Sequence, residues 1–453
     1  MSTIFAPITP ISKLGVATIR ISGSQTIVCL QHLGITKKPL HQKTTFHKLI
    51  NPVNGELLDE VLVTFFQAPF SFTGEDVAEI SIHASPYIAK EIFNILAQLP
   101  EVRFAEAGEF SKRAFLNGKI DLIQAEAIPD LIAAETASQH RQSLQQLQGE
   151  LGKIYESWRT AIIEVVALIE AAIDFPDEDL PAEIVVHARE LVTKIVNEIN
   201  VHLDDNKIGQ KIKDGLSLAI IGAPNVGKSS LINFLAKSDI AIVSDIAGTT
   251  RDIVETHLQI AGIAVKIADT AGLRQSVDII EQEGIRRALD KAQQADIKIL
   301  LIDATDLRIE NDCRQFIDSN TIVLINKADL LDKDFHEETL LSMLNLTFAN
   351  KPIIISLQQQ SNLRNFLTKL EEKILEIIPH HNAPLITQER YRLYLQNSVT
   401  SLNAFLSRKN IENIIELAAE DLRLACDEIG RISGKIDIEN ILDVIFSRFC
   451  IGK

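Results

Sequence analysis

The sequence predicts a protein of the α/β and α classes. A mixed α+β N-terminal domain precedes a discontinuous helical domain, and an α/β domain with a mostly parallel sheet is inserted into the helical one. Short apolar runs alternate with helical segments between residues 213 and 375, as in buried parallel strands with connecting helices. Apolar residues recur at steps of three and four both before and after this region. Neither helical segment alone buries its apolar stripe, so we expect the two to pack together.

The N-terminal domain is predicted to span residues 1–118. Val16–Ser22 alternates apolar and polar side chains, and residues 61–66 and 77–82 show the same pattern. Residues 89–99 have the composition of a helix. Strict alternation predicts strands that bury one face against a core.

The helical domain is predicted in two parts, residues 119–212 and 376–453, with the α/β domain at 213–375 between them. The stripe of the first part comprises Leu144, Leu147, Leu151, Ile154, Trp158, Ala161, Val165, Leu168 and Ala172. Asp174–Pro181 interrupts it, and a helical pattern resumes to about Lys211. The stripe of the second part comprises Ile411, Ile414, Ile415, Ala418, Leu422, Ala425 and Ile429.

Composition narrows the class of protein. The net charge of −16 argues against a broad basic surface that binds nucleic acid over the whole molecule. No apolar run approaches the roughly 18 residues of a membrane span, and the N-terminus has no secretion signal. The four cysteines are scattered and form no CxxC pair, so neither a disulfide framework nor a zinc site is predicted. These features fit a reducing cytoplasm.

Four motifs stand in order in the predicted α/β domain. They are Gly222–Ser229 (GAPNVGKS), Gly248–Thr250 (GTT), Asp269–Gly272 (DTAG) and Asn326–Asp329 (NKAD). The first follows a predicted strand and opens a helix, so backbone N–H groups can wrap phosphates and Lys228 can reach the β- and γ-phosphates. An isolated match would also fit an ordinary strand–turn–helix connection. Together the four predict a nucleotide-hydrolysing switch.

The same motifs predict the base and the metal. Asn326 and Asp329 are predicted to identify the base. A carboxylate can accept two hydrogen bonds from the guanine edge, whereas adenine would leave it unpaired, so GTP is predicted rather than ATP. Ser229 and Thr250 are the expected Mg²⁺ ligands, and Asp269 can hold the magnesium shell. The expected GTP-binding residues are Asn225, Val226, Gly227, Lys228, Ser229, Ser230, Ser244, Asp245, Ile246, Ala247, Gly248, Thr249, Thr250, Asp269, Thr270, Ala271, Gly272, Asn326, Lys327 and Asp329.

The residue after Gly272 is Leu273, where Ras-type switches carry a water-orienting glutamine. Leucine cannot orient water, so another group must do so or hydrolysis is very slow. The acidic candidates nearby are Asp278, Glu281 and Glu283, which could equally be solvated surface charges. Asn225 and the segment 244–250 could also hold a monovalent cation that supplies positive charge beside the phosphates.

Beyond the switch, three separated blocks resemble the tRNA modification GTPase MnmE (TrmE) family. The N-terminal block comprises Gly15–Gly23, Ser71–Val77 and Ala107–Leu122, and the C-terminal block is Cys450–Lys453 (CIGK). The four GTPase motifs form the remaining block. The resemblance runs from about residue 5 to residue 453. The first and last blocks are much more specific than the GTPase motifs, which many proteins share.

The resemblance implies an N-terminal domain that dimerises and binds a tetrahydrofolate derivative, such as 5-formyl- or 5,10-methylene-tetrahydrofolate. The implied folate-binding residues are Arg20, Glu79, Lys119 and Lys453. Without the family, a lone strand arginine or glutamate is better explained by a surface ion pair. The chemistry is compatible, because cations suit a carboxylate-bearing ligand and a glutamate can accept from a pterin-type ring.

The resemblance also implies roles in catalysis. Glu281 falls at the water-orienting position and Cys450 at the position of a C-terminal cysteine needed for modification. The implied potassium ligands are Asn225, Ser244, Ile246 through its carbonyl oxygen, and Thr249. Potassium would replace an arginine finger when two GTPase domains meet. From the residues alone, Cys450 could be a buried hydrophobe or an exposed thiol, and Gly452 and Lys453 fit a prenylation signal poorly.

The family further implies a heterotetramer with a flavin-dependent partner of the MnmG (GidA) family. Together the two would add an aminomethyl-type group at C5 of the wobble uridine of certain tRNAs, with tRNA bound mainly through the partner. Two departures stand out. His83-Ala84-Ser85 replaces the family's His-Gly-Gly, and Ser356-Leu357-Gln358 replaces Ser-Ala-Lys beside the guanine.

Two alternatives remain open at this point. One is a ribosome-assembly GTPase of the Era or Der type. Residues 376–453 contain no GxxG loop of a KH module, and no second GTPase motif set is present, so both Era and Der patterns are incomplete. The other is a folate-sensing scaffold without chemistry of its own.

Overall fold

The computed structural model describes most of the chain in nine continuous segments and a few residues near the C-terminus. The described residues are 2–12, 15–174, 182–238, 256–268, 292–309, 311–331, 351–379, 383–409, 414–436 and, near the C-terminus, 442, 445–447, 449, 450 and 452. They form two compact units. The first comprises residues 1–129, 146–196 and 394–453, and the second comprises 130–145 and 197–393. The four-part division predicted from the sequence stays a prediction.

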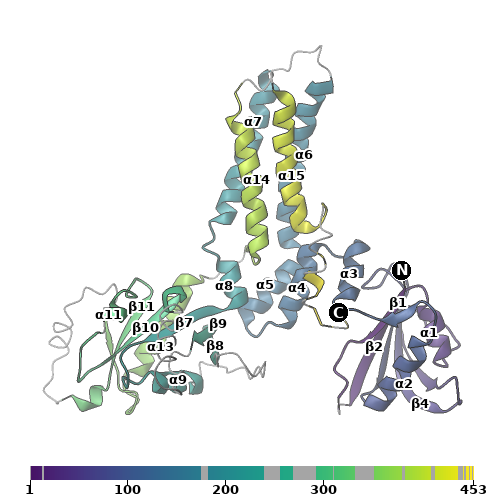
Figure 1. Cartoon of the computed structure of the whole chain (residues 1–453), viewed down its shortest axis with the longest axis horizontal. Helices are drawn as coiled ribbons and strands as arrows, with labels where there is room; N and C mark the ends of the chain where they lie inside the picture. The colour runs from purple at the N-terminus through teal and green to yellow at the C-terminus, as the bar shows by residue number, and fades with distance from the viewer. Residues whose placement is uncertain are drawn as a thin grey trace, which may run out of the picture. The chain divides into compact units, whose positions relative to one another are not determined.

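The first unit begins with a six-stranded, mainly antiparallel sheet (Figure 1). Its strands are β1 (Thr3–Pro7), β2 (Val16–Ser22), β3 (Thr44–Ile50), β4 (Leu57–Phe66), β5 (Val77–His83) and β6 (Val102–Phe104), in the order β3-β4-β5-β2-β1-β6. The predicted strands at 16–22, 61–66 and 77–82 are confirmed. The predicted helix at 89–99 is α2 (Pro86–Ala97), which begins earlier because proline is well suited to the first helical turn.

Alternation along β2 decides what each face of this sheet carries. Ala17, Ile19 and Ile21 are fully buried in a core that also contains residues of α1 (Thr26–His32) and α2. Arg20, between them in sequence, therefore lies on the opposite face. The register places it directly across from Glu79 of β5.

The helical part of the first unit is built from segments far apart in the sequence. The helices that lie wholly or mostly in this unit are α3 (Glu109–Leu116), α4 (Leu122–Ile132), α6 (Glu150–Asp174), α7 (Ala182–Leu203), α14 (Glu389–Ser407) and α15 (Ile415–Ser433). Helices α6 and α15 pack along each other and bury, among others, Val165 and Leu422. Figure 1 shows α15 beside α6. The prediction that the two stripes pack together is confirmed.

A turn lies within the predicted stripe of the first helical part. The stripe from Leu144 to Ala172 is not one helix, because Gly149 adopts a left-handed conformation with φ +77° between α5 (Ala137–Leu147) and α6. Periodicity continues across this turn, so the pattern could not reveal the break.

The second unit contains a six-stranded sheet in the order β12-β11-β10-β7-β9-β8. The strands are β7 (Leu216–Ile221), β8 (Thr256–Ile260), β9 (Ile263–Ala268), β10 (Ile297–Asp303), β11 (Thr321–Asn326) and β12 (Ile353–Ile354), with only β8 antiparallel to its neighbour. Helices α9 (Lys228–Lys237) and α13 (Leu363–Ile377) share one core with β7, and residues around α11 (Asn311–Arg314) help to cover the other face. The predicted parallel α/β domain is confirmed.

In the part of the chain that the structure describes, every helix is too short or too polar to span a lipid bilayer.

Candidate functional site

The phosphate-binding motif lies where β7 ends and α9 begins, at the carboxyl edge of the parallel sheet. At two positions of the loop, neighbouring atoms lie so close to the backbone that only glycine fits. A Cβ atom on Gly222 would lie 2.2 Å from the carbonyl oxygen of Leu301, and one on Gly227 would lie 2.5 Å from Nδ2 of Asn326. Both residues also have positive φ, which glycine adopts without strain. The loop is therefore pressed against the neighbouring strands.

Lys228 lies over this loop at the first turn of α9. Its ammonium donates hydrogen bonds to the carbonyl oxygens of Gly222 (2.7 Å) and Ala223 (2.8 Å). Ser229 and Ser230 follow it and are exposed. A helix N-terminus with a cation above a glycine-containing loop is suited to phosphate groups, and an exposed serine hydroxyl in this turn suits a magnesium ligand.

Asn326 connects the phosphate loop to the base-reading end of the sheet. At the end of β11 it is only 4% exposed. Its Nδ2 donates to the carbonyl oxygen of Val226 (2.8 Å), and its Oδ1 accepts from the backbone N–H of Leu357 (3.1 Å). The structure thus brings two motifs together that lie about a hundred residues apart in the sequence.

Asp329 is held by the loop that follows β12. The buried hydroxyl of Ser356 accepts from the backbone N–H of Gln359 (3.0 Å) and donates to Oδ1 of Asp329. This hydrogen bond sets the orientation of the Asp329 carboxylate. The segment Ser356-Leu357, which departs from the family pattern, therefore still contacts both predicted base-reading residues.

Lys327 lies between these two residues and makes an ion pair at the same edge. Its Nζ is 2.6 Å from Oδ2 of Asp303, the last residue of β10. Burial acts to raise the pKa of Asp303, but hydrogen bonds from Lys327 and Thr305 outweigh it and hold this pKa below its ordinary value. Asp303 therefore stays ionised beside Lys327. Sequence reasoning missed Asp303, although its place at a strand end next to the predicted site was a signal.

Several predicted site residues lie outside the described residues, so the roles given to them above remain predictions. They are Ser244, Asp245, Ile246, Ala247, Gly248, Thr249, Thr250, Asp269, Thr270, Ala271, Gly272, Glu281 and Lys453. Of the expected metal ligands, the structure describes Ser229 for magnesium and Asn225 for potassium. Asn225 is exposed in the phosphate loop and has φ +62°.

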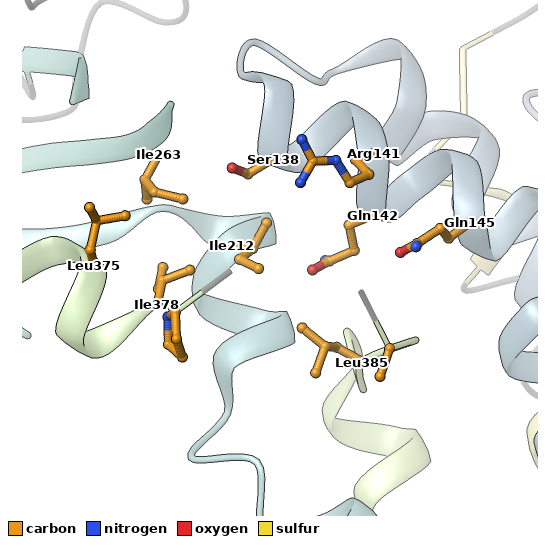
Figure 2. A pocket seen from close by; sticks show the side chains of 11 residues that line it. Ser138, Arg141, Gln142, Gln145, Ile212, Ile263, Leu375, Ile378 and Leu385 are labelled. Carbon is orange, nitrogen blue, oxygen red and sulfur yellow. The ribbon is translucent and has the colours of Figure 1, made fainter. Parts of the chain in front are cut away.

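The second unit also contains a cavity of about 40 Å³ away from these motifs (Figure 2). Polar residues of α5 line one side, and apolar residues including Ile212 of α8 (Ile208–Asp214) line the other. Gln142 donates from Nε2 to the carbonyl oxygen of Gly209 (2.9 Å), while its buried Oε1 accepts no hydrogen bond from the described residues. No predicted site residue lines this cavity, so it is separate from the phosphate loop.

In the first unit, Arg20 and Glu79 form a cross-strand pair. Both Nε (2.9 Å) and Nη2 (2.8 Å) of Arg20 donate to the same oxygen, Oε1 of Glu79. The Arg20 guanidinium also lies over the rings of Phe72 (5.6 Å) and Phe110 (5.4 Å). The pair is partly exposed, so a planar ligand with polar edges could approach an orienting cation, a carboxylate and an aromatic face together.

Lys119 reaches the same loop from another direction. Its Nζ donates to the carbonyl oxygen of Pro69 (2.9 Å), in the loop that also carries Phe72. The side chain is exposed. The structure therefore brings Arg20 and Glu79 into direct contact, whereas Lys119 contacts the loop whose Phe72 lies against Arg20.

A buried ion network beneath this loop was not predicted. Arg113 donates to both oxygens of Glu75 (3.1 and 3.0 Å), to Glu109 (2.9 Å) and to the carbonyl oxygen of Ser2 (2.7 Å). Burial favours the neutral form of Glu109, but hydrogen bonds from Arg103, the Glu106 backbone and Arg113 hold its pKa below the ordinary value. The spacing of Glu109 and Arg113, four residues apart on a helix, was an available signal.

Cys450 is exposed, whereas Phe449 beside it is buried. Of the two possibilities that the residues left open, the structure has the exposed thiol. The other three cysteines, Cys29, Cys313 and Cys426, are buried.

Two family models cover nearly all of the chain. The model "GTP-binding protein TrmE N-terminus" matches residues 3–119, and "MnmE helical domain" matches residues 122–450. Among curated proteins, "tRNA modification GTPase MnmE" of Rickettsia typhi is 45% identical over the whole of both chains. The protein of that name from Rickettsia prowazekii is also 45% identical over the whole of both. A solved structure of Era from Aquifex aeolicus is 26% identical over 43% of this chain and 68% of its own, with a TM-score of only 0.27.

The family assignment depends on the family models and the full-length relatives, not on that weak structural likeness. By both of these, the chain belongs to the tRNA modification GTPase MnmE family.

Proposed function

We propose that this tRNA modification GTPase works with an MnmG (GidA) family flavoprotein to add a carboxymethylaminomethyl- or aminomethyl-type group at C5 of uridine 34 in certain tRNAs. Membership of the family supports GTP hydrolysis and a role in tRNA modification. The observation that carries the GTPase assignment is the contact of Asn326 with Val226, which joins the phosphate loop to the base-reading motif at one sheet edge. The flavoprotein partner and the reaction at C5 go beyond what family membership supports, and they are our proposal.

In the nucleotide site, the chain's own groups have separable roles. The Lys228 ammonium moves from loop carbonyl oxygens to the β- and γ-phosphates and balances their charge. Ser229 and Thr250 would hold Mg²⁺, which supplies charge stabilisation at the transferred phosphoryl group. Glu281 orients the attacking water in place of a glutamine. Asp329, held by Ser356, accepts from the guanine edge.

Asn225, Ser244, Ile246 and Thr249 would hold K⁺, whose positive charge near the phosphates acts as an arginine finger does in other GTPases. Asn225 is the one of these residues that the structure describes, and its exposed place in the phosphate loop is compatible with this role.

Exchange of potassium for sodium is expected to abolish the stimulated part of GTP hydrolysis, because the smaller ion fits the same oxygen ligands poorly. Hydrolysis would be measured at constant ionic strength in KCl and in NaCl, with GTP affinity measured in both as the control. Equal rates in the two salts would remove potassium from the mechanism.

The Arg20–Glu79 face is proposed to bind the tetrahydrofolate derivative that supplies the one-carbon unit, together with Lys119 and Lys453. The combination of cation, carboxylate and the Phe72 ring on one sheet face supports this assignment. Flavin redox chemistry is assigned to the partner.

The same sheet face is proposed to contact a second copy of the chain. Phe46 of β3 and Leu62 of β4 lie opposite each other in register and are 60% and 48% exposed, an unusual apolar pair on the sheet that carries Arg20. Covering these side chains would remove apolar area from water. We further propose that the chain forms a homodimer, that it assembles with the flavoprotein into a heterotetramer, and that it works in the cytoplasm. We expect tRNA to bind mainly through the partner, because this chain carries a net charge of −16.

Replacement of Cys450 by serine is expected to abolish C5 modification while GTP hydrolysis stays normal, because the exposed thiol is proposed to act at the modification centre and lies outside the unit that carries the phosphate loop. Wobble uridines would be analysed by mass spectrometry in cells that carry only the variant. Replacement of the buried Cys29 by alanine is the matched control.

Normal modification in the Cys450→Ser cells would favour a scaffold role. Normal modification in cells without the protein would contradict the proposed function as a whole. The alternative of an Era- or Der-type ribosome-assembly GTPase has no support from the family models, which cover residues 3–119 and 122–450.

A further inference from the structure

Helix α5 (Ala137–Leu147) belongs to both units of the chain. Its residues up to 145 lie in the second unit, and its last two residues lie in the first. The helix has 11 residues, which corresponds to a length of about 16 Å. An α-helix of this length moves as one body, so a displacement at one end is carried to the other.

The first turn of α5 is bonded to a turn of the parallel sheet. Ser138 is partly buried and donates from Oγ to the carbonyl oxygen of Gly262 (2.9 Å), in the two-residue turn that joins β8 to β9. Figure 2 shows the Ser138 side chain pointing toward Ile263, the first residue of β9. One turn further along α5, Gln142 donates to the carbonyl oxygen of Gly209 (2.9 Å) and fixes the helix to α8.

Strand β9 connects this turn to a switch motif. It spans Ile263–Ala268, and the next residue is Asp269 of the DTAG motif, which is expected to hold the magnesium shell. Along its length β9 pairs with β7, for example Val265 with Leu216. A strand held in register by a neighbour transmits a shift along its axis. A change at the DTAG motif when GTP is hydrolysed is therefore carried to the turn that Ser138 contacts.

The last turn of α5 is bonded to the start of α4. Gln124 donates from Nε2 to the carbonyl oxygen of Leu147 (2.9 Å). Its Oε1 accepts from the backbone N–H of Asp121 (2.9 Å), and Oδ1 of Asp121 accepts from the backbone N–H of Gln124 (2.7 Å). This reciprocal pair is the arrangement of a capping box, which fixes the first turn of a helix. Lys119, assigned above to the folate face, lies two residues before Asp121.

We propose that α5 couples the nucleotide state of the GTPase to the folate face, with Ser138 and Gln124 as the positioning residues at its two ends. The proposal rests on the function proposed above, because it concerns the regulation of the folate site assigned there. Ser138 links α5 to the turn between β8 and β9, and Gln124 links α5 to the segment that carries Lys119. By linkage, GTP changes the affinity for folate by the same factor by which folate changes the affinity for GTP.

The test measures the affinity of the full-length protein for 5-formyl-tetrahydrofolate by calorimetry, with GDP and with a non-hydrolysable GTP analogue. In the wild type the two affinities are expected to differ by at least about 5-fold, the lower end of typical allosteric coupling. Ser138→Ala is expected to bring this ratio close to one, because α5 is no longer bonded to the turn between β8 and β9. Ser138→Thr retains the hydroxyl and is expected to retain the ratio.

Gln124→Glu tests the other end of α5. Glutamate keeps an acceptor for the Asp121 N–H but has no donor for the Leu147 carbonyl oxygen, so the capping box remains and the bond to α5 is lost. The ratio of folate affinities is expected to fall close to one here as well. Ser157→Ala is the matched control, because Ser157 is exposed and bonds to the carbonyl oxygen of Ile154 in its own helix (2.7 Å). This control is expected to keep the wild-type ratio.

Amide hydrogen exchange of α5 supplies a readout that does not depend on folate. The α5 amides are expected to exchange at different rates in the two nucleotide states of the wild type and of Gln124→Glu, but at the same rate in both states of Ser138→Ala. If Ser138 only stabilised the fold, its loss would change the exchange rate by the same factor in both states. Equal exchange of α5 in the two states of the wild type would overturn the coupling.

Failure of the coupling can be told from failure of the folate assignment. If 5-formyl-tetrahydrofolate binds equally well in both nucleotide states of the wild type, or if Ser138→Ala keeps the wild-type ratio, the coupling is wrong and the folate assignment stands. If it binds in neither state while α5 still responds to the nucleotide, the folate assignment is contradicted, and the coupling to that face with it.

Discussion

Replacement of Asp329 by asparagine is expected to lower the affinity for GTP by about 10²–10³-fold, through the loss of two charge-assisted hydrogen bonds to guanine. The variant is expected to bind xanthosine triphosphate instead. Xanthine presents a carbonyl oxygen where guanine presents an amino group, so the asparagine NH₂ gains an acceptor that the carboxylate could not use. Affinities for the two nucleotides would be measured by calorimetry on wild type and variant.

The structure explains why this substitution should exchange specificity rather than disrupt the site. The Ser356 hydroxyl donates to Oδ1 of Asp329, and an asparagine Oδ1 can accept the same bond. The asparagine Nδ2 then takes the place of the other carboxylate oxygen, which is the atom available to the base. The side chain is only partly buried, so the lost charge leaves no deeply buried partner.

Asp306→Asn is the matched control, since Asp306 lies in the loop after β10 and pairs with the exposed Arg308. It removes the same charge from the same edge of the sheet without touching a base-reading residue. An Asp329→Asn protein that still preferred GTP over xanthosine triphosphate would contradict the guanine assignment.

Replacement of Arg113 by methionine is expected to destabilise the N-terminal sheet by about 3–5 kcal/mol, the usual cost of leaving buried charges without their partner. The Arg113 side chain is 4% exposed and is shared by Glu75 and Glu109, which are largely buried themselves. Local stability would be measured by amide hydrogen exchange of β1, β2 and β5 in the full-length protein, because a multidomain chain has no single unfolding free energy.

Arg423→Met is the control for this experiment. Its ion pair with Glu170 is half-exposed and screened by water, so we expect its loss to have little effect on stability. If the amides of the sheet exchange as slowly in Arg113→Met as in the wild type, the ion network contributes little to the stability of the sheet.

The same network predicts a pH dependence with a definite sign. The pKa of Glu109 is lowered in the folded protein from an ordinary value of 4.5. A carboxylate with a lowered folded pKa stabilises the fold above its ordinary value, and this contribution is lost as the pH falls through the lower folded value. Protection of the sheet should therefore be constant at neutral pH and decline only in acid.

Much of this molecule could be predicted from local patterns. The strands 216–221 and 321–325 are almost entirely apolar because both of their faces are covered, and the phosphate loop has glycines where the backbone requires them. The family was identified from the same residues, since its blocks are short stretches of sequence. The break at Gly149 could not be predicted, because apolar spacing continues across the turn.

Contacts between distant segments could not be predicted from these patterns. The sequence by itself determined which side chains are present at the guanine site and the folate face, because motif spacing is a local property. Only the tertiary structure showed that Asn326 bonds to Val226, that Ser356 orients Asp329 and that Ser138 bonds to Gly262. These contacts depend on how sheets and helices pack. A change of a few ångströms in that packing would break each of them without altering a single motif.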